Sequence, residues 1–303
     1  YLKDRGFSEE IIKHFGIGLA PFGNKVYKLL KGSKYSDDDI LKLGLCNSND
    51  DIHDVFVNRI IFPLWDLEGR VVGFSGRIYN NNDSAKYINS KESIIFKKGT
   101  LLYNYHLAKE AVRRSKSVIV VEGFMDVIAM YRVGIKNVVA TMGTGITSVQ
   151  AKLLRKLSSN IILCFDGDKA GEKATISCCD ELSKFRVIPT AIRVEEKTDP
   201  DDYIKEKGID KFKYHLDNPI SFIDYKMLVY KQDKNFDNSE DISRYIKEVI
   251  GELSLVNDSV VQEVALKKVS DETGVSLDTL LEMVDRNVSK KERKFVKKVD
   301  KYE

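Results

Sequence analysis

The chain has 303 residues, of which 43% are hydrophobic and 31% are charged, and its formal net charge is +3. Such a chain can bury a substantial core, so we expect a globular protein of two or three domains or subdomains. No apolar run reaches the roughly 18 residues of a membrane span, and no signal-peptide pattern opens the sequence. We therefore expect a cytoplasmic protein with no membrane partner. The net charge is too small to indicate nucleic acid by itself.

Four cysteines are scattered along the chain. They show neither the paired spacing of metal ligands nor the even framework of a small secreted fold. We therefore predict reduced thiols at Cys46, Cys164, Cys178 and Cys179.

Residues 1–115 are mixed and rich in turns. Two β-rich runs, Ile60 to Trp65 and Arg70 to Phe74, flank the polar segment Asp66 to Gly69. Polar residues and a glycine between two such runs are typical of a hairpin turn. We therefore predict a β-containing N-terminal subdomain over residues 1–115.

From residue 116 to 205, short β-branched runs alternate with helical patterns. This alternation predicts a mostly parallel sheet covered by helices. The expected strands are Val118 to Val121, Val138 to Ala140, Ile161 to Phe165 and Val187 to Val194, and the expected helices are Asp126 to Arg132, Val149 to Leu157 and Gly171 to Phe185.

Beyond residue 205 the spacing of apolar residues is helical. We predict a helical subdomain over 206–290 and a lysine-rich tail or linker over 291–303. The fold class is therefore α/β in the centre and α+β overall. The expected helices of this part are Phe222 to Tyr230, Ile242 to Leu253, Val260 to Thr273 and Leu277 to Val284.

Two carboxylates follow the expected strand that ends at Phe165. Asp166 and Asp168 are separated by Gly167, and residues two apart on a strand point to the same side. Carboxylates placed this close repel each other unless a proton or a cation lies between them, and Mg²⁺ favours such ligands. A plain surface turn is the alternative for this tripeptide alone.

Acidic residues also follow two other expected strands. Glu122 comes directly after Val121, with Asp126 one turn into the next helix. A third group, Asp199, Asp201 and Asp202, comes after the last strand of the series. The carboxyl ends of parallel strands meet at one edge of a sheet. The three groups together predict a two-metal site for phosphoryl transfer.

The motifs of residues 1–205 resemble those of a known family. The strings EGFMDVIAMYRVGIKNVVATMGTGIT, LCFDGDKAGEKA and KTDPDDY resemble the TOPRIM domain of DnaG-type bacterial primases. Upstream, YLKDRGFSEEIIKHFGIGLAP, NRIIFPLWDLEGRVVGFSGR and KYINSKESIIFKKGTLLYN resemble the N-terminal part of the same RNA polymerase core. Lys91 stands where a proline is usual, and Phe124 replaces a commoner tyrosine.

The resemblance implies an enzyme that makes short RNA primers on single-stranded DNA from ribonucleoside triphosphates. It implies Mg²⁺ or Mn²⁺ held by Asp166, Asp168 and Asp201, with Asp199 and Asp126 as further candidates and Asp202 behind them. Glu122 would bind metal or act as a general base. The implied catalytic residues are Glu122, Asp166 and Asp168.

The resemblance also implies partners and missing parts. We expect a replicative helicase as a partner in the bacterial replisome, through a domain that lies outside this chain. Zinc is expected only in an N-terminal domain, also outside it. Guanosine tetraphosphate is a possible inhibitor, because a triphosphate site can accept its phosphates.

Basic residues of the first subdomain alternate with aromatic ones. Cationic groups bind phosphates and flat apolar surfaces stack on unpaired bases, so this set suits a DNA template or a triphosphate. The alternative is a solvated lysine-rich face over an ordinary aromatic core. The candidates are Arg59, Arg77, Lys86, Tyr87, Asn89 and Lys98, with Lys97 behind them.

Three other functions stay open at this stage. A topoisomerase or nuclease shares the acidic edge but needs further cleavage machinery. A phosphatase with an Asp-x-Asp nucleophile fits poorly, because Ala170 stands two residues after Asp168. The chain could also be a nucleotide- or partner-binding module that is inactive without the missing domains. The turn Gly143 to Gly145 lacks a phosphate-loop signature, and we interpret it as a tight strand-to-helix turn.

Overall fold

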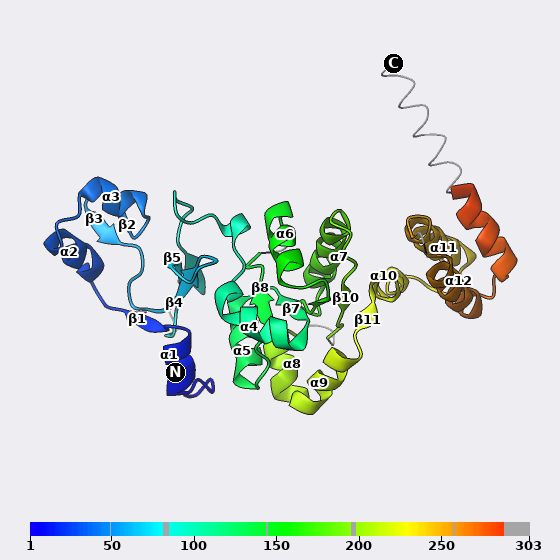
Figure 1. The fold of residues 1–303 in the computed structure, drawn as a ribbon, viewed down its shortest axis with the longest axis horizontal. Coiled ribbons are helices and arrows are strands. Elements are labelled where there is room, and N and C mark those ends of the chain that lie inside the picture. The colour runs from blue at the N-terminus through cyan, green and yellow to red at the C-terminus, as the bar shows by residue number, and fades with distance from the viewer. Residues whose placement is uncertain (49, 81–84, 144, 195–197, 257, 288–303) are drawn as a thin grey trace, which may run out of the picture. The chain divides into compact units, whose positions relative to one another are not determined.

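The computed structural model describes residues 1–48, 50–80, 85–143, 145–194, 198–256 and 258–287 (Figure 1). The chain forms two compact units, Tyr1–Asn218 and Pro219–Glu303. The first unit extends beyond residue 205, the boundary expected from the sequence, because the helix over Ile209–Asp217 also belongs to it. The predicted tail over 291–303 lies outside the described residues.

The N-terminal part of the first unit contains an antiparallel sheet in the order β1-β4-β5-β6. The expected β-rich runs are confirmed as its central strands, and a smaller pair, β2 and β3, stands apart. The strands are β1 (Gly18–Ala20), β2 (Cys46–Ser48), β3 (Ile52–Asp54), β4 (Arg59–Trp65), β5 (Val71–Arg77) and β6 (Tyr87–Asn89). The helices are α1 (Glu9–His14), α2 (Lys25–Gly32) and α3 (Asp37–Lys42), and a short 3₁₀ turn, η1, spans Lys98–Thr100.

The turn between β4 and β5 is the predicted hairpin. The Asp66 carboxylate accepts the main-chain N–H groups of Glu68 and Arg70, at 3.0 Å and 2.9 Å. Gly69 has a φ of 87°, which glycine adopts at little cost. The local sequence therefore determines both the position and the register of this hairpin.

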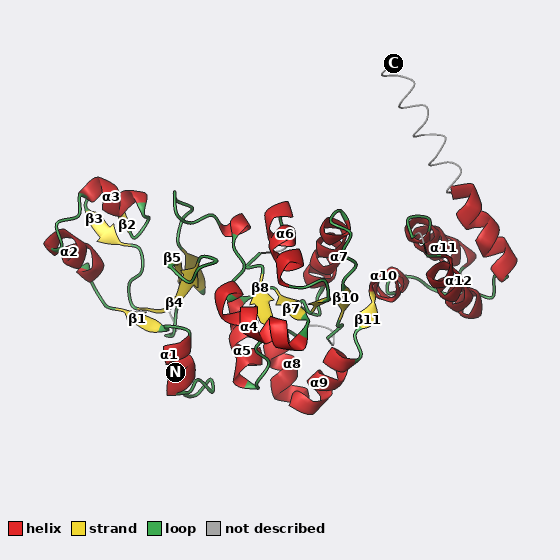
Figure 2. Ribbon diagram, in the orientation of Figure 1, coloured by secondary structure: helices red, strands yellow, loops and turns green. Residues whose placement is uncertain are grey.

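The second sheet of this unit is parallel, as predicted. Its strands lie in the order β10-β9-β7-β8, and helices follow each of them in sequence (Figure 2). β10 is shorter than the expected strand. The strands are β7 (Val118–Val121), β8 (Val138–Ala140), β9 (Ile161–Leu163) and β10 (Thr190–Ala191). The helices are α4 (Tyr105–Ser115), α5 (Phe124–Arg132), α6 (Ser148–Leu157), α7 (Lys169–Ser183), α8 (Pro200–Lys207) and α9 (Ile209–Asp217).

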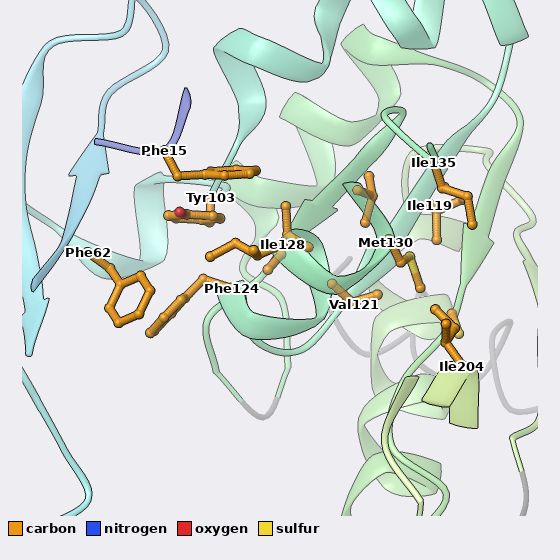
Figure 3. Packing of buried hydrophobic residues seen from close by; sticks show 14 of the residues in the cluster. Phe15, Phe62, Tyr103, Ile119, Val121, Phe124, Ile128, Met130, Ile135 and Ile204 are labelled. Atoms are coloured by element: carbon orange, nitrogen blue, oxygen red, sulfur yellow. The ribbon is translucent and has the colours of Figure 1, made fainter. Parts of the chain in front are cut away.

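One aromatic core joins the two sheets of the first unit (Figure 3). The Phe62 ring of β4 lies 4.7 Å from the Phe124 ring at the start of α5, and Tyr103 lies 5.7 Å from the same ring. Phe15 stacks on Tyr103. Burying side chains of this size stabilises a fold by about 1.5–3 kcal/mol each. The N-terminal part is therefore held against the parallel sheet.

The described residues of the second unit are mostly helical, as predicted. A two-residue strand, β11 (Ile220–Ser221), precedes the helices. Tyr245, Leu253 and Leu266 are in its buried core. The helices are α10 (Phe222–Lys231), α11 (Ser239–Leu253) and α12 (Ser259–Thr273), and residues 277–287 are also helical.

Two general expectations concern the whole chain. All four cysteines are buried as free thiols. Within the described ranges, the helices are too short or too polar to cross a lipid bilayer.

Candidate active site

The ends of β7 and β9 are joined by a carboxylate. Glu122 follows β7, and its Oε1 accepts the main-chain N–H of Asp166, 3.2 Å away. We call Glu122, Asp126, Asp166, Asp168 and Asp199 the acidic edge. The structure thus places two of the three predicted acidic groups beside each other.

Asp166 and Asp168 lie in a turn and not on a strand. β9 ends at Leu163, so the expected alternation along a strand does not bring the two side chains together. Instead Asp168 begins α7, where its Oδ1 accepts the main-chain N–H of Gly171 across 2.7 Å. A Cβ on Gly171 would lie 2.1 Å from the carbonyl oxygen of Asp166, so only glycine fits this turn.

The third acidic group is bonded to the same turn. The main-chain N–H of Gly167 donates to the carbonyl oxygen of Thr198 across 2.8 Å. Asp199 then begins α8, and its Oδ1 accepts the N–H of Asp202 at 2.7 Å. Asp199 is therefore positioned on one side by the bond between Gly167 and Thr198 and on the other by its own bond to the first turn of α8.

Asp126 lies in the first turn of α5 and is bonded to the residue before this helix. Its Oδ2 accepts the N–H of Gly123 at 3.3 Å, which stabilises the start of α5. Its carboxyl is nearly buried, and burial together with the charges of Asp199 and Asp166 raises its pKa well above the ordinary range.

The electrostatics of the acidic edge fit a bound cation. Burial and the charges of Glu122 and Asp199 raise the pKa of Asp166 to about 7. Burial also raises the pKa of Glu122 and of Asp199. Asp166 Oδ1 is buried and has no hydrogen-bond partner among the described residues. A divalent cation would relieve this repulsion and satisfy the unpaired oxygen.

The side chains of the described ranges do not already form a closed cluster of three or more metal-binding groups. This agrees with the hydrogen bonds above, because Glu122, Asp126, Asp168 and Asp199 each use one oxygen to accept a main-chain N–H. The remaining oxygens are the ones available to a cation.

Asp201 differs from its neighbours because basic side chains neutralise it. Arg132 at the end of α5 donates to its Oδ1 at 3.2 Å, and Lys205 to its Oδ2 at 2.5 Å. Lys205 also lies 3.4 Å from Asp202. Asp201 and Asp202 as metal ligands remain predictions, and the geometry gives Asp201 a structural contact that the sequence did not indicate. No motif in the sequence identified Arg132.

The predicted basic residues divide by burial. Arg59 is buried, where its guanidinium donates to the carbonyl oxygens of Gly76 and Ala85 at 3.2 Å and 2.9 Å. Arg77 is also buried, and its guanidinium donates to the Tyr87 hydroxyl at 2.7 Å. Lys86, Asn89 and Lys97 are exposed. Arg59 thus supports the loop after β5, and the N–H group that it uses there would otherwise be able to bind a phosphate.

Tyr87 connects the basic residues to the acidic edge. Its ring packs edge-on against Phe124, with the centroids 5.7 Å apart, and Phe124 is two residues from Glu122. The charge of Asp126 contributes to raising the pKa of Tyr87, behind burial as the main cause. Lys98 lies beside the loop after β8, because a Cβ on Gly143 would lie 3.9 Å from its Nζ.

The parallel sheet with carboxylates at the ends of its strands defines a Toprim-like fold. A family model described as Toprim-like matches residues 119–204. A model for the N-terminal domain of the DNA primase catalytic core matches residues 1–109. A third, for the DnaB-helicase binding domain of primase, matches residues 223–278.

Solved structures of primases have the same fold. A DNA primase domain from Pseudomonas aeruginosa is 30% identical, with a TM-score of 0.74, over 94% of this chain and 91% of that one. The zinc-binding and RNA polymerase domains of Aquifex aeolicus primase are 30% identical, with a TM-score of 0.75, over 93% of this chain and 68% of that one. The chain belongs to the DnaG family of DNA primases.

Curated relatives agree with this family. DNA primase of Staphylococcus aureus is 38% identical over 95% of this chain, and that of Clostridium acetobutylicum is 34% identical over 96% of it. The chain spans about half the length of these relatives, 48% in both cases.

One expectation needs correction. We placed the helicase-binding part outside the chain, whereas a model of the DnaB-helicase binding domain matches α10 to α12. The sequence of these helices carries no motif with evident chemistry, so periodicity alone identified them only as helical.

Proposed function

We propose that this chain is the catalytic core of a primase that synthesises RNA primers on single-stranded DNA from ribonucleoside triphosphates. The observation that carries the proposal is the acidic edge, where carboxylates from three segments lie together and one buried oxygen has no partner in the part of the chain that the structure describes. Family membership supports it. So does a solved DnaG primase catalytic domain bound to single-stranded DNA, which is 28% identical with a TM-score of 0.77.

We assign Mg²⁺ or Mn²⁺ to the acidic edge. Asp166 and Asp168 would hold it, with Asp199 and Asp126 completing the set, and Glu122 would either join them or act as the general base. When bound, the cation stabilises the negative charge on the phosphoryl oxygens and favours ionisation of the attacking hydroxyl. Asp201 and Asp202 would add negative charge near the cation from the first turn of α8, where Arg132 and Lys205 hold Asp201. Zinc belongs to none of these residues and would be confined to a separate N-terminal domain.

The proposed reaction is an in-line displacement at the α-phosphate. The 3′-oxygen of the primer forms a bond to the α-phosphorus, the bond to the β-phosphate oxygen breaks, and pyrophosphate leaves. Glu122 is the candidate to accept the hydroxyl proton, because burial raises its pKa and makes it a stronger base. Its hydrogen bond from Asp166 orients one oxygen and leaves the other for this task.

The basic and aromatic residues would bind the triphosphate and the template. Lys86, Asn89 and Lys98 offer polar groups at the surface, and Tyr87 offers a ring held by Arg77 and Phe124. Phosphates need charge, and unpaired bases need flat apolar surfaces. Arg59 would act mainly by supporting the loop after β5.

The proposed partners follow the family. The helical second unit would contact a replicative helicase, and the chain would work in the cytoplasm as part of a bacterial replisome. Guanosine tetraphosphate would compete for the triphosphate site through its phosphates. If guanosine tetraphosphate and GTP do not compete in a binding assay, this last assignment is refuted.

The test is incorporation of labelled ribonucleotides on a single-stranded template with Mn²⁺ or Mg²⁺, run beside a supercoiled plasmid. We expect incorporation and no change in the plasmid. Relaxation or nicking without incorporation would favour a topoisomerase or nuclease. Binding of triphosphate without incorporation, restored by adding a zinc domain, would mean that initiation depends on parts outside this chain.

A further inference from the structure

Gln150 is a buried amide that bonds to three separate points of the main chain. It lies in α6 with only 2% of its surface exposed. Its Oε1 accepts the N–H of Thr147 at 3.0 Å, and its Nε2 donates to the carbonyl oxygens of Leu101 and Thr141 at 2.7 Å and 3.1 Å. Both amide hydrogens and one acceptor position are therefore used.

One of these points, Leu101, follows the turn that carries Lys98. Leu101 comes directly after η1, and the Thr147 hydroxyl donates to the carbonyl oxygen of Gly99 at 2.6 Å. A Cβ on Gly99 would lie 3.0 Å from the Thr147 methyl group. η1 therefore lies in close contact with the start of α6, and Gln150 bonds to the residue that follows it.

Another of these points, Thr141, belongs to the loop beside Glu122. The N–H of Thr141 donates to the carbonyl oxygen of Val121 at 3.1 Å, and that of Met142 to the carbonyl oxygen of Glu122 at 2.9 Å. Met142 has a φ of 60°, an uncommon value for a side chain other than glycine. This loop is thus held against the main chain of a candidate catalytic residue.

We propose that Gln150 is a positioning residue for the triphosphate site, because it fixes the Lys98 turn relative to Glu122. The inference rests on the proposed function. One amide group joins the segment that presents the Lys98 ammonium to the loop that is bonded to Glu122. The Lys98 ammonium in turn lies beside Gly143 of the same loop. The competing explanation is that Gln150 only caps α6.

The test compares Gln150→Met with Gln262→Met. Methionine has a similar length and no N–H to donate. Gln262 is a matched control in the second unit, where its Nε2 also donates to two carbonyl oxygens, those of Leu253 and Val256, at 3.0 Å and 2.7 Å. Lys98→Ala and the double variant with Gln150→Met complete a double-mutant cycle.

Two measurements separate positioning from simple stability. Hydrogen exchange would follow the amides of Thr100 and Leu101, which donate to the carbonyl oxygens of Lys97 and Lys98. Equilibrium binding of fluorescent ribonucleoside triphosphate with Mn²⁺ would follow the site. We expect Gln150→Met to speed this exchange and to weaken triphosphate binding by about tenfold, as loss of the two hydrogen bonds that Gln150 donates to Leu101 and Thr141 suggests. Gln262→Met should change neither.

The cycle gives the decisive result. If Gln150 acts through Lys98, the double variant should bind triphosphate no more weakly than Lys98→Ala alone. Additive losses, or a Gln150→Met variant that behaves like Gln262→Met, would overturn the inference while leaving the proposed function intact. A parent chain that binds no triphosphate with Mn²⁺ would instead count against the proposed function, and the inference would fall with it.

Discussion

The main-chain N–H of Asp166 donates to Glu122 Oε1 across 3.2 Å, so the carboxylate after β7 is oriented by the turn after β9. Gln at position 122 would keep an oxygen acceptor for this bond and remove the charge. We therefore expect Glu122→Gln to fold normally and to slow ribonucleotide incorporation by about 10²- to 10⁴-fold, the usual contribution of a general base. Incorporation kinetics measure this, with exposed Glu68→Gln as the control. An unchanged rate would remove Glu122 from the catalytic residues.

Stability should depend on pH and metal together. The pKa of Asp166 is raised from 3.8 to about 7, so the folded chain retains a proton that the unfolded chain loses near pH 3.8. Between these values the unfolded state binds fewer protons, and the stability of the metal-free chain falls as pH rises. This stabilising contribution is complete below about pH 4 and lost above about pH 7.

A divalent cation competes with that proton. We therefore expect Mn²⁺ to raise the melting temperature more at about pH 8 than at about pH 5.5. Thermal unfolding of the parent chain and of Asp166→Asn measures the difference, and the variant should lose most of it. An equal effect of Mn²⁺ at both pH values would contradict the assignment.

Asp168 has two roles that different substitutions separate. Its Oδ1 caps α7 at Gly171, so Asp168→Ala should lose the cap, at a cost of about 1 kcal/mol, as well as the metal-dependent activity. Asp168→Asn keeps an oxygen for the cap and should lose activity with little change in unfolding free energy. Asp258→Asn is the matched control, because Asp258 caps α12 in the same way. An active Asp168→Asn variant would refute the metal assignment.

Gly171 determines the shape of the turn between the two aspartates. Because an added Cβ would meet the Asp166 carbonyl oxygen at 2.1 Å, Gly171→Ala should destabilise the fold by about 1–3 kcal/mol and reduce incorporation sharply. A Cβ on Gly251 in α11 meets nothing within 4 Å, so Gly251→Ala should stabilise the helix by about 0.5–1 kcal/mol. Chemical denaturation measures both. Equal effects of the two changes would argue against a tight turn.

Arg132 joins α5 to the start of α8. Its guanidinium donates to Asp201 Oδ1 at 3.2 Å and to the carbonyl oxygen of Arg5 at 2.8 Å. Arg132→Ala would leave these acceptors unpaired, so we expect a loss of about 1–3 kcal/mol in unfolding free energy. Arg114→Ala removes an exposed pair with Glu110 and should change it by less than about 0.5 kcal/mol. A neutral Arg132→Ala would show that Lys205 alone suffices for Asp201.

Most elements of this protein follow from local sequence. The hairpin at Asp66 to Gly69, the parallel strands and the helices of the second unit were all predicted, because alternation, helical spacing and turn residues act over a few neighbours. The convergence of Glu122 with the aspartates was also predictable, since parallel strands end at one edge.

What the tertiary structure alone decided are contacts between residues distant in sequence. No pattern in the sequence indicates that Arg132 neutralises Asp201 or that the Asp166 carbonyl oxygen excludes any side chain at Gly171. Nor does any pattern indicate that Gln150 joins the Lys98 turn to the loop beside Glu122. Such pairs depend on how helices and turns pack in three dimensions, which no short-range pattern records. The residue types that perform the chemistry are therefore visible in the sequence, whereas the groups that hold them in place appear only in the fold.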